Sequence, residues 1–465
     1  MASGSRLRRF LSGVAAAAVV LAPFAAQAQS LIRDTEIEAI LRENADPLLR
    51  VAGLEPKDVE IWIVGDKEIN AFAVAGQKIG LNTGLIVETE TPNQLAGVIA
   101  HEACHIACGH HARSGTMMRA GLKPFLLTMG LGIAAALAGS GAGAAALIGS
   151  SGHFATLNIL KYSRIQEGSA DQAAATYLDK AGLSGRGLVE FYENFRYQEV
   201  FSEARRMAYF RSHPLSSDRI NQLKVRVARS RHYDQVDSPE AMAKHAIMKA
   251  KLEAFLNPPA QTYIKYKEKD PSFPARYARA IAYYRASEPA HALRAIDALL
   301  AEQPNNPYLH ELKGQVLFEN GRVAESEGPH RRSVELKPDA TLLRVNLGRT
   351  LVALEDSKRN EEAIAELNRV VQIEPDMYEA WRLLAQAYDR KGDGGRARLA
   401  SAEAHYALGD KKQAKVFAMR AREQLDPGTP QRRRATDIVM ASDPTEADLR
   451  DLAREEGRSL AVTRR

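Results

Sequence analysis

Aromatic residues are scarce in this sequence, at 6% of the chain, and no run of basic residues is interleaved with them. A groove for single-stranded nucleic acid needs that combination of positive charge and stacking rings. The formal net charge of +6 is also modest for 465 residues. These absences exclude a nucleic-acid partner. The apolar content of 45% is enough for buried cores, and the length predicts roughly two or three domains.

Cysteine is almost absent, since only Cys104 and Cys108 are present. On a helix, the spacing of four residues holds the two Cβ atoms about 5–6 Å apart, farther than the ~3.8 Å of a relaxed disulfide. We therefore expect two free thiols that pack as small, buried apolar side chains. A redox-active pair is the alternative.

Residues 1–28 have the pattern of a secretory signal, with arginines before the apolar run 14–22 and a cleavage site at residues 26–28. The pair Arg8-Arg9 faintly resembles a twin-arginine signal, although paired arginines are commoner in ordinary signals. No cysteine follows the cleavage site, so nothing predicts a lipid anchor. We expect export to a bacterial periplasm.

The segment His101-Glu102-Ala103-Cys104-His105 is the motif that predicts chemistry. Residues four apart share one face of a helix, so both imidazoles point toward a single site. Zn²⁺ binds neutral imidazole readily, and Glu102 can accept a proton from metal-bound water. The motif therefore predicts hydrolysis of peptide bonds. The alternative is a core helix that buries two histidines.

A third metal ligand has two candidates. His111 lies six residues after His105, as in metzincins, but that motif needs glycine where Cys108 stands. We expect His110 and His111 to be polar residues near the end of the motif helix. Glu167 is the better candidate. Asp171 would lie on the same helix face and orient a ligating histidine, unless this is simply a solvated acidic face.

Several motifs together resemble one known family. The HExxH segment is followed by the R-x-x-E-x-x-A-D pattern of residues 164–171 and by His213-Pro214, and residues 70–85 match the strand and turn ahead of the motif helix. This order is similar to that of the HExxH zinc peptidases, which include the CAAX-prenyl proteases and bacterial membrane quality-control proteases. The resemblance covers most of residues 31–425.

The resemblance implies one Zn²⁺ per chain, held by His101, His105 and Glu167, with Glu102 as the catalytic base and acid. Asp171 would orient the metal ligands or assist proton transfer. In a periplasmic member of the family, the histidine that matches His213 is implicated as a removable fourth metal ligand. His213 would then keep the enzyme latent until substrate displaces it. Pro214 favours an extended backbone there, and Arg219 is expected to stabilise the same region or an oxyanion.

The predicted fold is mainly α: an α+β protease domain with a small sheet, followed by an all-α tetratricopeptide solenoid. A helix is expected over residues 31–50, strands over 59–64 and 71–74, and an aromatic-rich helix over 188–210. Prolines at positions 271, 304, 338 and 375 recur near the 34-residue tetratricopeptide period. The solenoid assignment also rests on the W-x₂-L-(small)-x₂-Y match of Trp381, Leu384, Ala385 and Tyr388.

We predict a metalloprotease domain over residues 29–238, a helical linker over 239–270, the solenoid over 271–427 and a polar tail over 428–465. No Asp, Glu, Lys or Arg occurs in residues 124–160. One membrane crossing there would separate the histidines from Glu167, and two would need about 40 apolar residues and a turn. We expect a helical hairpin that covers the active site or makes a peripheral membrane contact.

The sequence thus predicts an exported zinc endopeptidase. The resemblance implies that its substrates are unfolded or misassembled outer-membrane proteins and that its repeats dock on the outer-membrane assembly machinery. A periplasmic chaperone or assembly adaptor with a largely latent zinc site is a second hypothesis. An integral membrane protease, anchored by residues 124–160, is a third.

Overall fold

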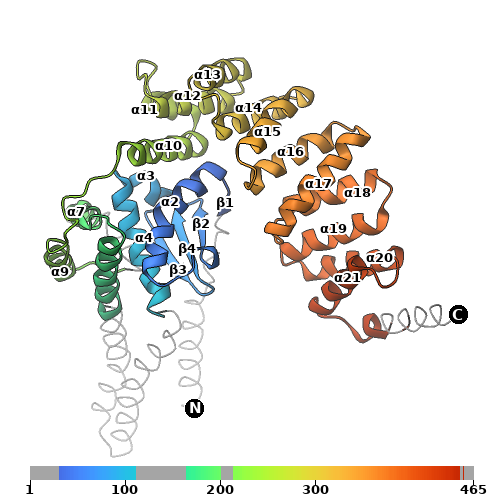
Figure 1. Ribbon diagram of the computed structural model, residues 1–465, viewed down its shortest axis with the longest axis horizontal. Coiled ribbons are helices and arrows are strands. Elements are labelled where there is room, and N and C mark those ends of the chain that lie inside the picture. Colours follow the sequence, from blue (N-terminus) through green and yellow to red (C-terminus); the bar gives the residue numbers. More distant parts are fainter. Residues whose placement is uncertain (1–30, 111–163, 200–212, 451–453, 455–465) are drawn as a thin grey trace, which may run out of the picture. The chain divides into compact units, whose positions relative to one another are not determined.

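The computed structural model describes residues 31–110, 164–199, 213–450 and 454 (Figure 1). The chain divides into two compact units. Unit 1 contains residues up to 32 and residues 43–237, and unit 2 contains residues 33–42 and the chain from 238 onward. The predicted signal (1–28) and the apolar run (124–160) lie outside the described residues.

Unit 1 is built on a four-stranded sheet in the order β1-β2-β4-β3. Strand β2 is parallel to β4, and the other neighbouring pairs are antiparallel. In the β3–β4 pair Gly80 lies opposite Phe72, and a Cβ atom at position 80 would come within 2.4 Å of the Phe72 ring. The strands are β1 (Leu31–Ile32), β2 (Glu60–Val64), β3 (Ala71–Val74) and β4 (Lys78–Asn82).

The predicted small sheet is therefore present, with one difference at its start. Helix α2 begins at Thr35 rather than at residue 31, because Leu31 and Ile32 pair with Val64 and Ile63 of β2 instead. The apolar side chains that suggested the first turn of a helix thus belong to a short strand.

Helix α4 (Pro92–Ala107) carries the HExxH motif and contacts strands β3 and β4 and helix α7 (Arg186–Glu199) (Figure 1). Its start is defined by Thr91, whose side chain accepts a hydrogen bond from the Gln94 amide, and by Pro92 in the first turn. Gly97 allows close packing on α7, because a Cβ atom there would lie 2.6 Å from Leu188 Cβ. The result is a helix that is buried along most of its length.

The remaining described elements of unit 1 hold the rest of the candidate site. A helix over residues 164–180 carries the R-x-x-E-x-x-A-D pattern, and the chain from His213 leads into α9. The helix expected over 188–210 begins two residues earlier and is described only to Glu199. The other elements are α2 (Thr35–Val51), the 3-10 turn η2 (Pro56–Asp58), α3 (Thr83–Glu88) and α9 (Ser217–Val227).

Unit 2 is a succession of helices in which each packs on the next. The tetratricopeptide pattern falls on α18, where Leu384 and Tyr388 are buried and Trp381 and Ala385 pack against the same cluster. The predicted fold class, with a small-sheet protease domain and an all-α solenoid, is confirmed. The helices are α10 (Pro239–Leu256), α11 (Pro259–Lys265), α12 (Phe273–Arg285), α13 (Pro289–Glu302), α14 (Pro307–Glu319), α15 (Val323–Leu336), α16 (Thr341–Ala353), α17 (Ser357–Ile373), α18 (Tyr378–Arg390), α19 (Gly394–Ala407), α20 (Lys411–Gln424) and α21 (Pro430–Ala441).

Two segments near the ends of unit 2 form packed helices. Residues 239–270, predicted as a helical linker, contain α10 and α11, and α10 packs against α12. The expected polar tail, residues 428–465, contains α21, which buries Ala435, Ile438 and Val439 in a cluster with α19 and α20. These apolar positions are too few to stand out in an arginine-rich segment, but they share one face of a helix.

The first residues of α2 join unit 2 through buried charges. Lys251 is 3% exposed, and its ammonium lies 2.8 Å from an Asp34 carboxylate oxygen and 3.1 Å from a Glu36 carboxylate oxygen. A buried ammonium requires such partners, so these contacts fix the segment on α10. Among the described residues, no helix is both long and apolar enough to cross a membrane.

The tight contact at Gly97 yields a stability prediction. Gly97→Ala should destabilise unit 1 by about 1–3 kcal/mol, because the new methyl group overlaps Leu188. Gly168→Ala, on the helix over 164–180, should instead be neutral or stabilise by up to about 1 kcal/mol. Apart from its chain neighbours and the backbone of its own helix, no atom of the described residues lies within 4 Å of its Cβ position. Urea unfolding followed by Trp62 fluorescence, in a Trp381→Phe background, measures unit 1 alone. Equal midpoints for the two variants would contradict the packing argument.

Candidate metal centre

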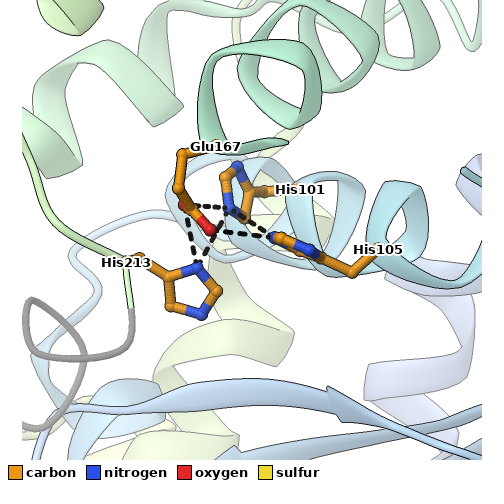
Figure 2. Close-up of side chains that lie close together, drawn as sticks. All are labelled: His101, His105, Glu167 and His213. Atoms are coloured by element: carbon orange, nitrogen blue, oxygen red, sulfur yellow. Dashed lines mark hydrogen bonds and ion pairs between the residues drawn. The ribbon is translucent and has the colours of Figure 1, made fainter. Parts of the chain in front are cut away.

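Four side chains from three separate segments converge in unit 1. His101 and His105 come from α4, Glu167 from the helix over residues 164–180, and His213 from the segment before α9 (Figure 2). Each offers one ligand atom, and these four atoms lie within 4.8 Å of one another. All four residues are buried, so the donors face one another in a site largely shielded from solvent.

The distances show which ring atoms face the centre. The Nε2 atoms of His101 and His105 are 3.2 Å apart, and His101 Nε2 lies 3.3 Å from Glu167 Oε2. His213 Nδ1 is 3.0 Å from the same carboxylate oxygen and 3.4 Å from His101 Nε2. Three imidazole nitrogens and a carboxylate oxygen are a donor set that suits Zn²⁺.

Glu102 lies beside this donor set with its carboxylate inside the protein. The residue is 0% exposed, and neither oxygen has a hydrogen-bond partner among the described residues. Its Oε1 is 3.4 Å from His213 Nε2. A buried carboxylate without hydrogen bonds is costly, so this arrangement fits a residue whose partner is a water molecule held by a metal.

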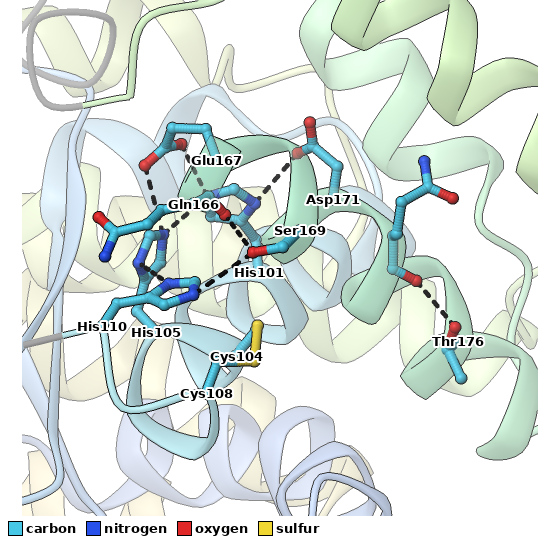
Figure 3. The surroundings of a disulfide bond; sticks show 11 residues. His101, Cys104, His105, Cys108, His110, Gln166, Glu167, Ser169, Asp171 and Thr176 are labelled. Carbon is cyan, nitrogen blue, oxygen red and sulfur yellow. Dashed lines mark hydrogen bonds and ion pairs between the residues drawn. A yellow bond between two sulfur atoms is a disulfide. The ribbon is translucent and has the colours of Figure 1, made fainter. Parts of the chain in front are cut away.

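His101 is supported from behind by Asp171. Asp171 Oδ1 lies 3.2 Å from His101 Nδ1, on the side of the ring that faces away from the other ligand atoms (Figure 3). Arg219 donates two hydrogen bonds to Asp171, at 2.7 and 2.9 Å, and the Tyr192 hydroxyl donates a third at 3.0 Å. A carboxylate held this firmly accepts a hydrogen bond from the Nδ1–H of His101 and leaves Nε2 of His101 for the metal.

Arg219 also connects this support to the segment that carries His213. Its guanidinium donates a hydrogen bond to the Pro214 carbonyl oxygen at 2.7 Å and lies 3.3 Å from a Glu167 oxygen. Arg219 is therefore a buried link between Asp171, Glu167 and the His213 loop, rather than a group that points at a substrate.

The carboxylates control protonation of the metal-free site. Burial opposes a charge on His101, but hydrogen bonds to Asp171 and Glu167 outweigh burial and raise the pKa of His101 to about 10. Burial and the nearby His101 charge lower the pKa of His105 to about 2. Burial also opposes the Glu167 charge, yet hydrogen bonds to His101 and His213 hold its pKa well below the usual range. The metal-free pair of α4 histidines thus carries one positive charge, on His101, while His105 is neutral.

Three residues near the site were not identified as supporting residues from the sequence. Tyr192 is buried on α7, where an aromatic residue is hard to distinguish from ordinary core packing. His110 was expected to be a polar residue at the helix end, but it is buried against His105, and Ser169 lies next to His110. His111 lies outside the described residues.

The expectation of two free thiols was wrong. Cys104 and Cys108 form a disulfide, with their Cα atoms 5.3 Å apart (Figure 3). The expectation assumed a regular helix through both residues, whereas α4 ends at Ala107 and Cys108 is its C-terminal cap. The Cα separation lies within the ~4.4–6.8 Å range of disulfides.

Comparisons with known proteins agree with this geometry. A model of Peptidase family M48 matches residues 32–227, and a tetratricopeptide repeat model matches residues 277–341 and 346–414. The beta-barrel assembly-enhancing protease of Yersinia pestis is 25% identical over 368 residues, which cover 78% of this chain and 74% of the relative. The protein of the same name from Escherichia coli K12 is 24% identical over 413 residues, covering 87% and 82%. Metalloprotease LoiP of the same strain is 30% identical over 180 residues, covering 37% of this chain and 64% of LoiP.

The raised pKa of His101 yields a prediction about metal loading. Because a histidine ligand must be neutral, zinc has to displace the His101 proton at any pH below about 10. Zinc affinity should therefore rise about tenfold per pH unit through the neutral range, with about one proton released per ion. Calorimetry in buffers of different ionisation enthalpy measures the protons released. The Asp171→Asn variant should release fewer protons per zinc ion at neutral pH. A wild-type protein that releases no protons on binding zinc would contradict the assignment.

Proposed function

We propose that this chain is an exported zinc endopeptidase that degrades misfolded or stalled outer-membrane proteins. The basis is the match of residues 32–227 to Peptidase family M48 and the tetratricopeptide repeats that follow. The family resemblance and the metalloendopeptidase activity predicted from the motifs are confirmed by these matches. The relatives that cover most of the chain are named for beta-barrel assembly, which supports a role in outer-membrane protein assembly. The secretory-signal pattern of residues 1–28 supports a location in the periplasm. The catalytic domain in this proposal is residues 29–238, and the repeats bind protein partners.

The observation that carries the proposal is the convergence of His101, His105 and Glu167 beside the buried carboxylate of Glu102. These three residues would hold the zinc ion. Bound zinc would lower the pKa of a water ligand to about 7 and polarise the scissile carbonyl as a Lewis acid. Glu102 would accept the proton of the attacking water and deliver it to the leaving amine nitrogen. Asp171, held by Arg219, would keep His101 in position throughout.

Strand β3 suggests how an extended substrate is held. It lies at the edge of the sheet, pairs only with β4 among the described strands, and contacts α4. An extended peptide that adds to this edge by main-chain hydrogen bonds would lie beside the motif helix. Such binding requires unpaired backbone in the substrate, which favours unfolded over folded proteins.

His213 supports the proposal of a latent site. Its Nδ1 lies 3.0 Å from Glu167 Oε2, and its Nε2 lies 3.4 Å from Glu102 Oε1. The imidazole thus occupies the space between a metal ligand and the catalytic carboxylate, where the attacking water would have to lie. Its segment is held through the Pro214 carbonyl and Arg219, so a substrate that moves this segment would free the site.

The repeats favour a second candidate function, that of a periplasmic chaperone or assembly adaptor. Helices α12 to α20 span most of the two repeat matches, and tetratricopeptide solenoids commonly bind other proteins. In this case zinc would mainly stabilise the fold.

Glu102→Gln separates the two functions. The amide cannot accept a proton, so cleavage of a denatured outer-membrane β-barrel protein should fall about 10²-fold to 10⁴-fold while zinc content stays the same. Gel-based cleavage assays and metal analysis of the purified protein measure both. Glu190→Gln, on an exposed part of α7, is the matched control and should behave as wild type. Intact cellular function in Glu102→Gln cells would favour the adaptor.

His213→Ala tests latency. Removing the imidazole should open the water position and raise the cleavage rate severalfold, with zinc still held by the other three ligands. His232→Ala, which removes a partly exposed histidine elsewhere in unit 1, should leave the rate unchanged. A His213→Ala protein that loses zinc and activity together would show that His213 is a permanent ligand.

A further inference from the structure

The motif helix ends in a turn that brings His110 back against His105. Gly109 has a φ of +65°, its amide donates to the Ile106 carbonyl at 3.0 Å, and the His110 amide donates to the His105 carbonyl at 3.1 Å. These two bonds are those of a Schellman motif. The same turn places the His110 ring on the far side of His105, where its Nδ1 lies 3.0 Å from His105 Nδ1.

His110 is also connected to the helix that carries Glu167. Its Nε2 lies 3.4 Å from the Ser169 hydroxyl, a long hydrogen bond (Figure 3). The Ser169 hydroxyl in turn donates to the Gln166 carbonyl oxygen at 2.7 Å. A chain of polar contacts thus runs from a metal-ligand candidate through His110 and Ser169 to the backbone.

The direction of every hydrogen bond in this series follows from the Gln166 carbonyl oxygen at its end. A carbonyl oxygen only accepts, so the single Ser169 proton points at Gln166, and the hydroxyl oxygen accepts from His110 Nε2. A neutral imidazole carries one N–H, so His110 Nδ1 is an acceptor. The proton between the two rings therefore belongs to His105 Nδ1.

His105 must then present an unprotonated Nε2, which is the atom that faces the ligand cluster, 3.2 Å from His101 Nε2. We propose that His110 and Ser169 are positioning residues that fix the Nδ1–H tautomer of His105 and thereby prepare its Nε2 to bind the metal. His110 and Ser169 accept and orient the N–H of His105, as Asp171 does for His101, but they do so with uncharged groups. This inference rests on the proposed zinc site. It adds two residues, His110 and Ser169, to which neither the motifs nor the relatives' names assign a role.

Zinc affinity is the first test. Removal of such a supporting partner typically weakens metal binding about 10-fold to 100-fold, so His110→Ala should do so in competition with a fluorescent zinc chelator. His110→Asn should restore affinity to within a few-fold of wild type, because the Asn side-chain oxygen can accept near the position of His110 Nδ1. His291→Ala, an exposed histidine of unit 2, is the control and should change nothing. Unchanged affinity in His110→Ala would overturn the inference.

A double-mutant cycle shows whether the two residues act as one chain. Ser169→Ala alone should weaken zinc binding less than His110→Ala, because His110 can still accept. In the His110→Ala background, Ser169→Ala should have no further effect, since the chain is already broken. Additive losses would mean that the two residues act separately and would overturn the proposed chain.

The tautomers themselves can be observed in the zinc-loaded wild-type protein. In ¹⁵N-labelled histidine spectra, His105 should show a proton on Nδ1 and His110 a proton on Nε2. A proton on both nitrogens of His110, or on Nδ1 alone, would overturn the inference even if the variants failed to fold. A wild-type protein that binds no zinc would instead refute the proposed function, so the two failures are distinguishable.

Discussion

A neutral histidine that binds a metal through one ring nitrogen carries its proton on the other, and that N–H almost always donates to an acceptor. The structure around α4 follows from this requirement, because two histidines four residues apart on one buried helix each need a separate acceptor. Asp171 lies behind His101, and His110 lies behind His105. The two acceptors come from different segments, so the site assembles only when the helix over residues 164–180 and the end of α4 both reach their places.

The two acceptors also differ in charge, which makes the pair of ligands unequal. Asp171 is a carboxylate held by Arg219, and it raises the pKa of His101, whereas His110 is not an anion and contributes to lowering the pKa of His105. Arg219 carries the same network to Pro214 and so to His213. One buried guanidinium therefore connects the support of a metal ligand with the segment proposed to block the site.

Sequence alone predicted the parts of the site that have fixed spacing. The HExxH spacing identified His101, Glu102 and His105, and the Glu167–Asp171 spacing placed two carboxylates on one helix face. His213 was found only through the family resemblance, because a histidine before a proline in a loop has no distinctive spacing. The small sheet and the solenoid period were predictable because strand alternation and a 34-residue repeat are local patterns.

The supporting residues could not be predicted, because they meet the site through tertiary packing. In the sequence, Tyr192 is indistinguishable from an ordinary core residue, and Ser169 from an ordinary polar residue on a helix. The position of His110 depends on the left-handed Gly109 after α4, whereas His110 was expected only to lie near the end of a regular helix. The same error, a helix continued too far, led to the expectation of two free thiols.

The disulfide has a consequence for the order in which the protein matures. Cys104, Cys108 and His110 offer ligand atoms within 4.8 Å of one another, and two thiolates with an imidazole are a set that zinc binds well. In a reduced chain this set would compete for the ion and would take His110 away from His105. Oxidation removes the two sulfur ligands from that competition. A chain whose cysteines are oxidised before it binds zinc would offer the metal one of these two sites, whereas a chain that binds zinc while still reduced would offer both.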